Sequence, residues 1–378
     1  MNSQINPNKN NKNKESQPTI LIMAGGTGGH VMPALAVAKA LIQKNYKVHW
    51  LGTQKGLEAK LVPQNDIPIS YISISGLRGK GWQSLLLAPF KIIRAIFQSY
   101  KIIKAIQPRA VLSMGGYVAG PGGIAAFLTR TPILIHEQNA ISGLTNRLLA
   151  PFAKIIMTAF PNVFPKRFDN KIHQTGNPIL DSFIHLPTPS ERFSKREGNL
   201  NLRLLVIGGS LGALGINTLV PKTISMIPKD WRPEIIHQTG LEHFDRVEKM
   251  YQTLGLQAKL EPFINNMAKA YDWADVVISR AGALTIAEIA AAGVTSILIP
   301  FPQAVDDHQT KNAEYLSQEE AAFLLPQKDL TPEILSKHLM ALIQNSNLRL
   351  KMATSCRKLA QLNATQNVVG HCLEVSGE

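Results

Sequence analysis

TILIMAGGTGGHVMPALAVAKAL, residues 19 to 41, predicts a strand, a glycine-rich turn and a helix in direct succession. A β-branched apolar run leads into four glycines, after which apolar residues return with helical spacing. Glycines at such a point leave backbone N–H groups free at the positive end of a helix, where a phosphate group binds well. The turn is neither a P-loop nor a dinucleotide fingerprint, because Val31 occupies the third glycine position and no Gly-Lys-Ser/Thr follows.

The same order of elements recurs in the second half of the chain. LLVIGGSLGA, from Leu204, repeats the strand and the glycine-rich turn, and a third glycine-rich segment spans residues 113 to 123. Short β-branched runs alternate with amphipathic stretches, which is typical of parallel sheets covered by helices on both faces. Since 378 residues exceed the size of an ordinary single core, we predict an α/β protein. It should have two Rossmann-like, doubly wound parallel-sheet domains whose glycine loops face one cleft.

Composition places the boundaries of these domains. Residues 1–16 are rich in Asn and Lys without an apolar run, so we predict a disordered tail and no signal peptide. Residues 17–176 should form the first domain and residues 177–350 the second, because a Pro-, Ser- and charge-rich segment lies near this boundary. A last helix over about 348–375 makes up the C-terminal segment, 351–378, and could pack on either domain, including back on the first.

Charge is distributed unevenly along the chain. The net charge is +14, but residues 1–176 alone carry +16 and the remainder −2. A basic half suits an anionic membrane surface or a phosphorylated substrate, and the sequence contains no nucleic-acid-binding module. Two cysteines lack metal-ligand spacing, and no apolar run approaches about 18 residues. We therefore expect a cytoplasmic protein that binds no nucleic acid and does not span a membrane.

His30 directly follows the first glycine-rich turn, at the end of a predicted strand. Side chains at that edge of a parallel sheet point into the expected cleft, and a neutral imidazole there could remove a proton from a hydroxyl group. The positive end of the helix would favour the neutral form that a base requires. The competing interpretation is a capping or packing histidine.

Seven motifs together resemble the GT-B glycosyltransferases, and within them the family 28 enzymes that add GlcNAc to lipid I in bacteria: GGTGGHVMPALAVA, GLRGKG, SMGGYVAGPGG, HEQNAISGLTNR, GGSLGA, SRAGALTIAEIAAAG and DDHQTKNA. The resemblance covers about residues 19–360. It implies an inverting hexosyltransferase, without cofactor or metal, that moves GlcNAc from UDP-GlcNAc to the C4 hydroxyl of MurNAc in undecaprenyl-pyrophosphoryl-MurNAc-pentapeptide, forming lipid II. A non-catalytic sugar-nucleotide-binding subunit and a GT-B-fold UDP-GlcNAc 2-epimerase are the alternatives.

The resemblance also implies the residues of the site. His30 would be the general base, and Glu137 and Tyr117 would orient His30 or the acceptor. Glu288 would accept both ribose hydroxyls of the donor, and the backbone at Ile264 would read uracil. The implied contacts with UDP-GlcNAc are Thr27, Gly28, Gly29, Asn139, Ser210, Ile264, Ala283, Leu284, Thr285, Ile286, Ala287, Glu288 and Gln309.

Two further features concern the diphosphate of the donor. Helix N-termini after Gly209 and Gly282 would stabilise the charge that develops on the leaving UDP. After GNP the family commonly has an arginine two residues on, whereas GNPILDS places Leu180 there, which puts that nucleotide contact in doubt. The adjacent carboxylates Asp306 and Asp307 are a weak metal signal, because a third ligand is missing.

The segment from residue 75 to 109 mixes basic and large apolar side chains, the pattern of a helix at a membrane surface. The competing interpretation is an amphipathic helix whose apolar stripe faces the core. We predict a peripheral protein on the cytoplasmic face of the bacterial inner membrane, where other cell-wall synthesis or division proteins could be partners. The predicted membrane-facing residues are Trp82, Leu85, Leu86, Phe90, Lys91, Arg94, Lys101 and Lys104.

Overall fold

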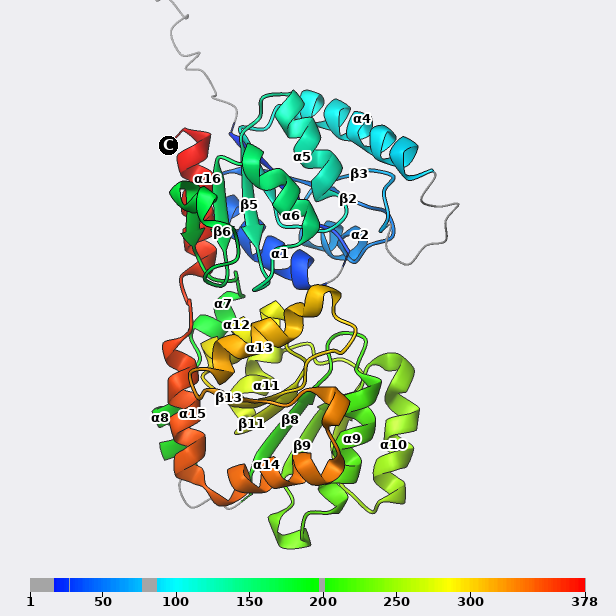
Figure 1. The fold of residues 1–378 in the computed structure, drawn as a ribbon, viewed down its shortest axis with the longest axis vertical. Helices are drawn as coiled ribbons and strands as arrows, with labels where there is room; N and C mark the ends of the chain where they lie inside the picture. Colours follow the sequence, from blue (N-terminus) through cyan, green and yellow to red (C-terminus); the bar gives the residue numbers. More distant parts are fainter. Residues whose placement is uncertain (1–16, 27, 77–86, 197–200, 378) are drawn as a thin grey trace, which may run out of the picture.

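The computed structural model describes residues 17–26, 28–76, 87–196 and 201–377. Two α/β domains follow one another along the chain, each built on a parallel sheet (Figure 1). Within the described residues, the first sheet has seven strands in the order β3-β2-β1-β4-β5-β6-β7, and the second has six in the order β10-β9-β8-β11-β12-β13. The prediction of two doubly wound parallel-sheet domains is confirmed. The predicted tail, residues 1–16, lies outside the described residues.

The strands are short and all their pairings are parallel. Those of the first sheet are β1 (Thr19–Met23), β2 (Lys47–Gly52), β3 (Ile69–Tyr71), β4 (Ala110–Ser113), β5 (Ile133–Glu137), β6 (Ile155–Thr158) and β7 (Ile172–Gln174). Those of the second are β8 (Arg203–Ile207), β9 (Glu234–Gln238), β10 (Lys259–Glu261), β11 (Val276–Ser279), β12 (Thr295–Leu298) and β13 (Ala322–Leu324).

Helices connect the strands and cover the sheets. The α-helices are α1 (Gly28–Gln43), α2 (Glu58–Leu61), α4 (Ala88–Ile106), α5 (Ala119–Leu128), α6 (Leu144–Leu149), α7 (Asp181–Ile184), α8 (Pro189–Ser194), α9 (Leu214–Ser225), α10 (Phe244–Thr253), α11 (Met267–Trp273), α12 (Ala283–Ala292), α13 (His308–Ser317), α14 (Pro332–Gln344), α15 (Ser346–Lys358) and α16 (Ala364–Ser376). Short 3-10 turns are η1 (Pro63–Asn65), η2 (Ala150–Phe152), η3 (Lys166–Lys171), η4 (Lys229–Trp231), η5 (Leu241–His243), η6 (Val305–Asp307) and η7 (Gln327–Asp329).

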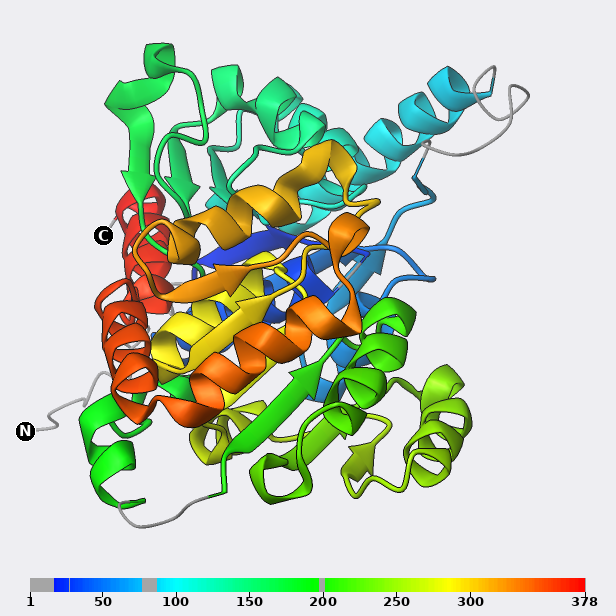
Figure 2. The same ribbon diagram turned by 60° about the horizontal axis from the view of Figure 1, so that its bottom comes forward.

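Each sheet is buried on both faces, because alternate residues of a strand point to opposite sides. In β1, Ile20 and Ile22 pack with α1 and α16, whereas Leu21 and Met23 pack with α4 and α5. The second sheet is covered by α9 and α14 on one face and by α11 and α12 on the other. Figure 2 shows α14, in orange, lying across this sheet. Burial on both faces explains why the strands are continuous apolar runs.

The C-terminal part of the chain crosses back from the second domain to the first (Figure 1). α15 packs against α8 and α12 of the second domain, and α16 packs against α1 and β4 of the first. Val368, Val369 and Cys372 of α16 join the core of the first domain. The prediction of one helix over about 348–375 is wrong, because the chain leaves the helical conformation between Lys358 and Ala364 to pass between the domains.

Candidate active site

A buried carboxylate holds the first glycine loop in place. Glu58, at the start of α2, accepts hydrogen bonds from the N–H of Gly26 at 3.0 Å and from the N–H and hydroxyl of Thr53 at 2.9 and 2.8 Å. Gly26 adopts a φ of +99°, which glycine adopts far more readily than other residues. The shape of the loop therefore depends on one contact that is distant in sequence.

The helix after this loop begins with predicted donor residues. α1 starts at Gly28, so Gly28 and Gly29 lie in its first turn, whose N–H groups have no acceptor within the helix. Such a turn can bind an anion. His30 follows in the same turn and is half-buried. Thr27, the remaining predicted donor contact of this loop, lies outside the described residues.

His30 is linked through Gln138 to a buried histidine. His30 Nδ1 lies 3.0 Å from Gln138 Oε1, and Gln138 Nε2 lies 3.1 Å from His136 Nδ1. His136 Nε2 lies 2.9 Å from the carbonyl oxygen of Gly176. Burial lowers the pKa of His136 to about 4, so its ring is neutral at pH 7. The ring of His30 fits here because Gly115 has no side chain, since a Cβ there would lie 2.9 Å from His30 Nδ1.

Neither Gln138 nor His136 was among the predicted site residues. The signal that points to them is alternation along the strand in HEQN, which places His136 and Gln138 on one side and Glu137 on the other. Glu137 is buried and accepts from the N–H of Gly143 at 3.0 Å and from Asn146 Nδ2 at 2.8 Å. Glu137 was predicted to orient His30 or the acceptor; the described contact with His30 is made by Gln138, and a role of Glu137 towards the acceptor stays a prediction.

Tyr117 lies at the surface of the first domain. It is 56% exposed, and its ring lies against Gly76, where an added Cβ would be 2.7 Å from the ring. The described contacts give Tyr117 no bond to His30, so its orienting role stays a prediction.

The second glycine loop is joined to the predicted uracil-reading segment by Gln238. Gln238, at the end of β9, donates to the carbonyl oxygen of Gly209 at 2.9 Å and accepts from the N–H of Ile264 at 3.0 Å. Ser210 is exposed beside this loop. The N–H of Ile264 is thus occupied, so its carbonyl is the backbone group left for the predicted contact with uracil.

The sequence HQTG at residues 237–240 also occurs at residues 173–176, and in both copies the threonine hydroxyl donates to the carbonyl of the following glycine.

Glu288 of α12 is the most strongly perturbed carboxylate near the predicted donor site. It is half-buried, and the Tyr271 hydroxyl donates to its Oε2 at 3.4 Å. Burial raises the pKa of Glu288 to about 8, and the hydrogen bond from Tyr271 opposes this shift. A carboxyl group in this state gains from further hydrogen-bond donors, such as the two hydroxyls of a ribose.

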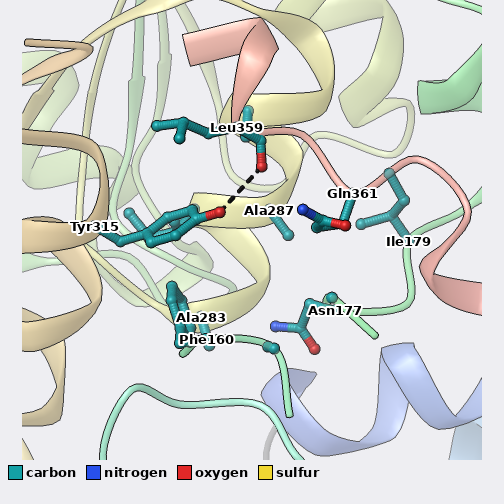
Figure 3. Close-up of a pocket in the computed structure, with 12 residues that line it drawn as sticks. Phe160, Asn177, Ile179, Ala283, Ala287, Tyr315, Leu359 and Gln361 are labelled. Atoms are coloured by element: carbon teal, nitrogen blue, oxygen red, sulfur yellow. Dashed lines mark hydrogen bonds between the residues drawn. The ribbon is translucent and has the colours of Figure 1, made fainter. Parts of the chain in front are cut away.

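The other predicted donor residues of α12 divide between two faces of the helix. Leu284 and Thr285 lie one turn before Glu288 and share its side. Ala283, Ile286 and Ala287 instead line a pocket between the domains, together with Asn177, Tyr315 and Gln361, as Figure 3 shows. The pocket measures about 30 Å³, far below the roughly 300 Å³ of a ligand site. The pocket therefore does not qualify as a donor site, and it lies beside the two places where the chain passes between the domains, at Gly176 and Leu359.

Asn312 of α13 joins the two domains at the end of β5. This fully buried side chain accepts from the N–H of Ala140 at 2.8 Å and donates to the carbonyl of Ala281 at 3.1 Å. It also donates to Asn139 Oδ1 at 3.3 Å, so the side chain of Asn139 is already engaged by the second domain. Gln309 Oε1 accepts from the N–H of Phe301 at 2.9 Å, which directs its amide nitrogen elsewhere. Asn312 was not among the predicted site residues.

The helix predicted to face a membrane turns three of its large apolar residues outward. Within α4 the buried positions are Ala88, Ala95, Ser99 and Ile103. Phe90, Ile93 and Phe97 are 72%, 63% and 56% exposed. The core side of α4 therefore combines the small residues Ala88, Ala95 and Ser99 with Ile103, while part of its large apolar surface remains exposed. The predicted basic residues Lys91, Arg94, Lys101 and Lys104 are exposed along the same helix.

The neighbouring helices extend this apolar surface. α5 packs against α4, and α6 against α5; Figure 1 shows α4 along the outer edge of the first domain and α6 nearer the second domain. The exposed residues of α5 and α6 include Phe127, Leu128, Leu144 and Leu148, and Phe152 of the following turn η2 is also exposed. No helix among the described residues is long and apolar enough to cross a membrane. Trp82, Leu85 and Leu86 lie outside the described residues.

Leu180, which stands where an arginine is common, is 38% exposed and directly precedes α7. Asp306 forms an exposed ion pair with Arg147 of α6 at 3.2 Å, and Asp307 accepts from the hydroxyl of Thr310 at 2.7 Å. Both carboxylates of the weak metal signal therefore take part in surface contacts.

Comparison with known proteins assigns both domains. Residues 20–158 match the glycosyltransferase family 28 N-terminal domain, and residues 203–368 match the glycosyltransferase family 28 C-terminal domain. The chain is 48% identical to the UDP-N-acetylglucosamine–N-acetylmuramyl-(pentapeptide) pyrophosphoryl-undecaprenol N-acetylglucosamine transferase of Marinobacter nauticus, over 94% of this chain and 97% of that protein. It is also 48% identical to the enzyme of the same name from Stutzerimonas stutzeri, over 94% of this chain and 98% of that protein.

A solved structure agrees with these relatives. The crystal structure of Acinetobacter baumannii MurG superposes with a TM-score of 0.80 at 40% identity, covering 94% of this chain and 99% of that chain. The two family matches span both domains, and their ranges contain the glycine loops and HEQN of this chain. The chain therefore belongs to glycosyltransferase family 28, as a member of the UDP-N-acetylglucosamine–N-acetylmuramyl-(pentapeptide) pyrophosphoryl-undecaprenol N-acetylglucosamine transferases.

Proposed function

We propose that this protein is an inverting glycosyltransferase that moves GlcNAc from UDP-GlcNAc to the C4 hydroxyl of MurNAc in lipid I, forming lipid II for peptidoglycan synthesis. The observation that carries the proposal is 48% identity over 94% of the chain to an enzyme named for this transfer. The placement of His30 in the first turn of α1, whose N–H groups have no acceptor within the helix, supports it.

The reaction needs a base on one side of the donor sugar and charge stabilisation on the other. The acceptor oxygen attacks the anomeric carbon, its proton passes to His30, and the bond to UDP breaks on the opposite face, which inverts the centre. The leaving UDP gains negative charge. The N-terminus of α12 after Gly282 and the exposed second glycine loop would stabilise that charge.

The function is tested by incubating the purified protein with labelled UDP-GlcNAc and a lipid I analogue. We expect a labelled disaccharide-lipid with the β configuration and release of UDP. Formation of UDP-ManNAc instead would identify a 2-epimerase. Donor binding without any product would indicate a non-catalytic sugar-nucleotide-binding subunit.

Donor affinity should depend on pH through Glu288. Its pKa of about 8 in the free protein leaves the carboxyl mostly protonated at pH 7. Ribose hydroxyls donate best to the ionised form, so donor binding lowers this pKa and releases a proton. Affinity for UDP-GlcNAc should therefore rise as pH increases from about 6 to 8. Calorimetric titration in two buffers of different ionisation enthalpy measures both the affinity and the proton release.

The isosteric variant Glu288→Gln is the comparison for this experiment. It should bind the donor more weakly by about 1 to 3 kcal/mol, the range for leaving hydrogen-bonding groups unpaired. Its affinity should also lose the rise between pH 6 and 8. If the variant keeps the wild-type affinity and slope, Glu288 does not contact the donor.

We also propose that α4, α5 and α6 form the surface that binds the membrane, where the lipid acceptor resides. Phe90, Ile93 and Phe97 would enter the interfacial region, and the exposed basic residues of α4 would contact anionic headgroups. Lys101 Nζ lies 4.5 Å from the Phe97 ring centroid, so one basic group and one apolar group share this face. The cytoplasmic leaflet, with its anionic lipids, matches this combination.

Removing the charges of α4 should weaken binding to vesicles. Replacing Lys91, Arg94, Lys101 and Lys104 with Gln should cost about 1 kcal/mol per charge on anionic vesicles. The difference from the parent should shrink at high salt, because salt screens exposed charges. Vesicle sedimentation over a range of ionic strength measures both effects.

A control with the same change in net charge is available on the second domain. Lys222, Lys229, Lys249 and Lys328 are exposed there, and replacing all four with Gln should leave vesicle binding near the parental value. If both quadruple variants bind equally, net charge alone governs binding and α4 has no special role.

A further inference from the structure

The hydrogen bonds behind His30 determine which of its ring nitrogens carries the proton. This series of hydrogen bonds ends at two carbonyl oxygens, those of Gly176 and His136, and a carbonyl oxygen can only accept. His136 Nε2 lies 2.9 Å from the carbonyl of Gly176, so it is the protonated nitrogen of that ring. His136 Nδ1 then has a lone pair, and it must accept from its neighbour, Gln138.

A second carbonyl fixes the orientation of the Gln138 amide independently. Gln138 Nε2 lies 3.3 Å from the carbonyl oxygen of His136 as well as 3.1 Å from His136 Nδ1. Because both neighbouring atoms are acceptors, the NH₂ group of the Gln138 amide must be the group that faces them. The amide oxygen therefore faces His30 Nδ1 at 3.0 Å, and an oxygen without a hydrogen can only accept.

We propose that Gln138 is a positioning residue, which holds the proton of His30 on Nδ1 and thereby leaves the lone pair on Nε2 to act as the base. The inference rests on the proposed function, because it assigns the reactive atom of the proposed base. Nε2 lies on the side of the ring away from Gln138. A base that accepts through Nε2 needs the proton on Nδ1.

Without this hydrogen bond, the ring would favour the wrong form. A free histidine side chain in water prefers its proton on Nε2, which would leave Nδ1 as the base. Nδ1 faces inward, towards Gln138 and Gly115. A serine protease loses about ten-thousandfold in kcat when its histidine is held in the wrong tautomer. Holding a catalytic histidine in the correct tautomer can therefore raise kcat by orders of magnitude.

The other titratable groups near His30 leave this role to Gln138. His136 lies behind Gln138, and burial keeps it neutral by lowering its pKa to about 4. Glu137 lies on the other side of β5, where its carboxylate binds the N–H of Gly143 and the side chain of Asn146. Tyr117, from the segment before α5, is exposed and packs beside Gly76.

Two substitutions at Gln138 separate positioning from packing. Gln138→Met keeps the length of the side chain but removes the acceptor. His30 should then shift its proton to Nε2, and kcat should fall at least tenfold, with donor affinity unchanged. Gln138→Glu keeps both contacts in its protonated form, which burial favours: one oxygen accepts from His30 and the hydroxyl donates to His136 Nδ1, so this variant should retain the tautomer and most of the activity. Gln174→Met, at an exposed position of β7, is the matched control.

The decisive measurement is the long-range ¹H–¹⁵N spectrum of histidine-labelled protein, which reports the protonated ring nitrogen directly. His30→Ala identifies the signal. We expect the Nδ1–H form in the parent, in Gln138→Glu and in Gln174→Met, and the Nε2–H form in Gln138→Met. A purely structural role for Gln138 would lower activity without this exchange of tautomers.

The outcomes distinguish failure of the inference from failure of the proposed function. If the parent makes no disaccharide-lipid, the proposed function fails, while the spectrum still reports the tautomer. If the parent is active but its His30 carries the proton on Nε2, the inference is overturned, even where Gln138→Met does not fold. Parental tautomer and activity in a folded Gln138→Met variant would overturn it equally.

Discussion

Replacing His30 with alanine should lower kcat by roughly a hundredfold to ten-thousandfold, the range for loss of a general base. Donor affinity should barely change, because most of the predicted donor contacts come from the second domain. Steady-state kinetics with a lipid I analogue give kcat, and calorimetric titration with UDP-GlcNAc gives the affinity. The acid limb of the kcat/KM profile, which reports protonation of the base, should disappear from the residual activity.

An exposed histidine provides the control for this variant. His173, on β7 at the edge of the first sheet, is exposed, and His173→Ala should retain the parental kcat and pH profile. Parallel loss of kcat and donor affinity in His30→Ala would show that His30 supports the glycine loop or the diphosphate instead. An unchanged acid limb would assign that ionisation to another group.

The strands that sequence could predict are those buried on both faces. β1, β4, β8 and β11 are apolar runs of four or five residues whose every position, or every position but the first, is buried. β7, β10 and β13 were not predicted. Each has three residues and lies at the edge of its sheet. An edge strand contacts one neighbour and can be polar, as IHQ of β7 and KLE of β10 are, whereas AFL of β13 is apolar but too short to mark a strand.

Sequence pattern also showed α4 as amphipathic without showing which side meets the core. A periodic apolar stripe normally faces inward. Here Ala95 and Ser99 face α5, while Phe90 and Phe97 face outward. The close approach of two helices requires small side chains, and that requirement depends on tertiary packing that sequence periodicity does not record.

The parts of the site nearest in sequence to a glycine turn were the parts that could be predicted. Gly28, Gly29 and His30 form the first turn of α1, as their spacing indicated. Gln138 was missed because its partner His30 lies 108 residues away. Asn312 was missed for the same reason, since it contacts Ala140 across 172 residues. Such contacts follow from strand order and domain packing.

Removing Glu58 should produce the largest loss of stability among the site residues. Its buried carboxylate accepts three hydrogen bonds from Gly26 and Thr53, and hydrogen bonds to a charged group contribute more than neutral ones. Glu58→Ala leaves two backbone N–H groups without their acceptor, so we expect a loss of about 3 to 5 kcal/mol in the unfolding of the first domain. Denaturant titration, followed by a probe in the first domain, measures this loss.

Glu191 is a control for Glu58, because its carboxylate makes almost the same local hydrogen bonds but is exposed to water. Its carboxylate accepts from the N–H and hydroxyl of Thr188 at 2.7 and 2.8 Å, as Glu58 accepts from those of Thr53. Glu191 is exposed, so water replaces these bonds in Glu191→Ala and the loss of stability should be small. Glu58→Ala should in addition lower kcat/KM, because Gly26 is no longer held. Equal effects of the two substitutions on stability, with activity unchanged in both, would contradict the assignment of Glu58 as the support of the glycine loop.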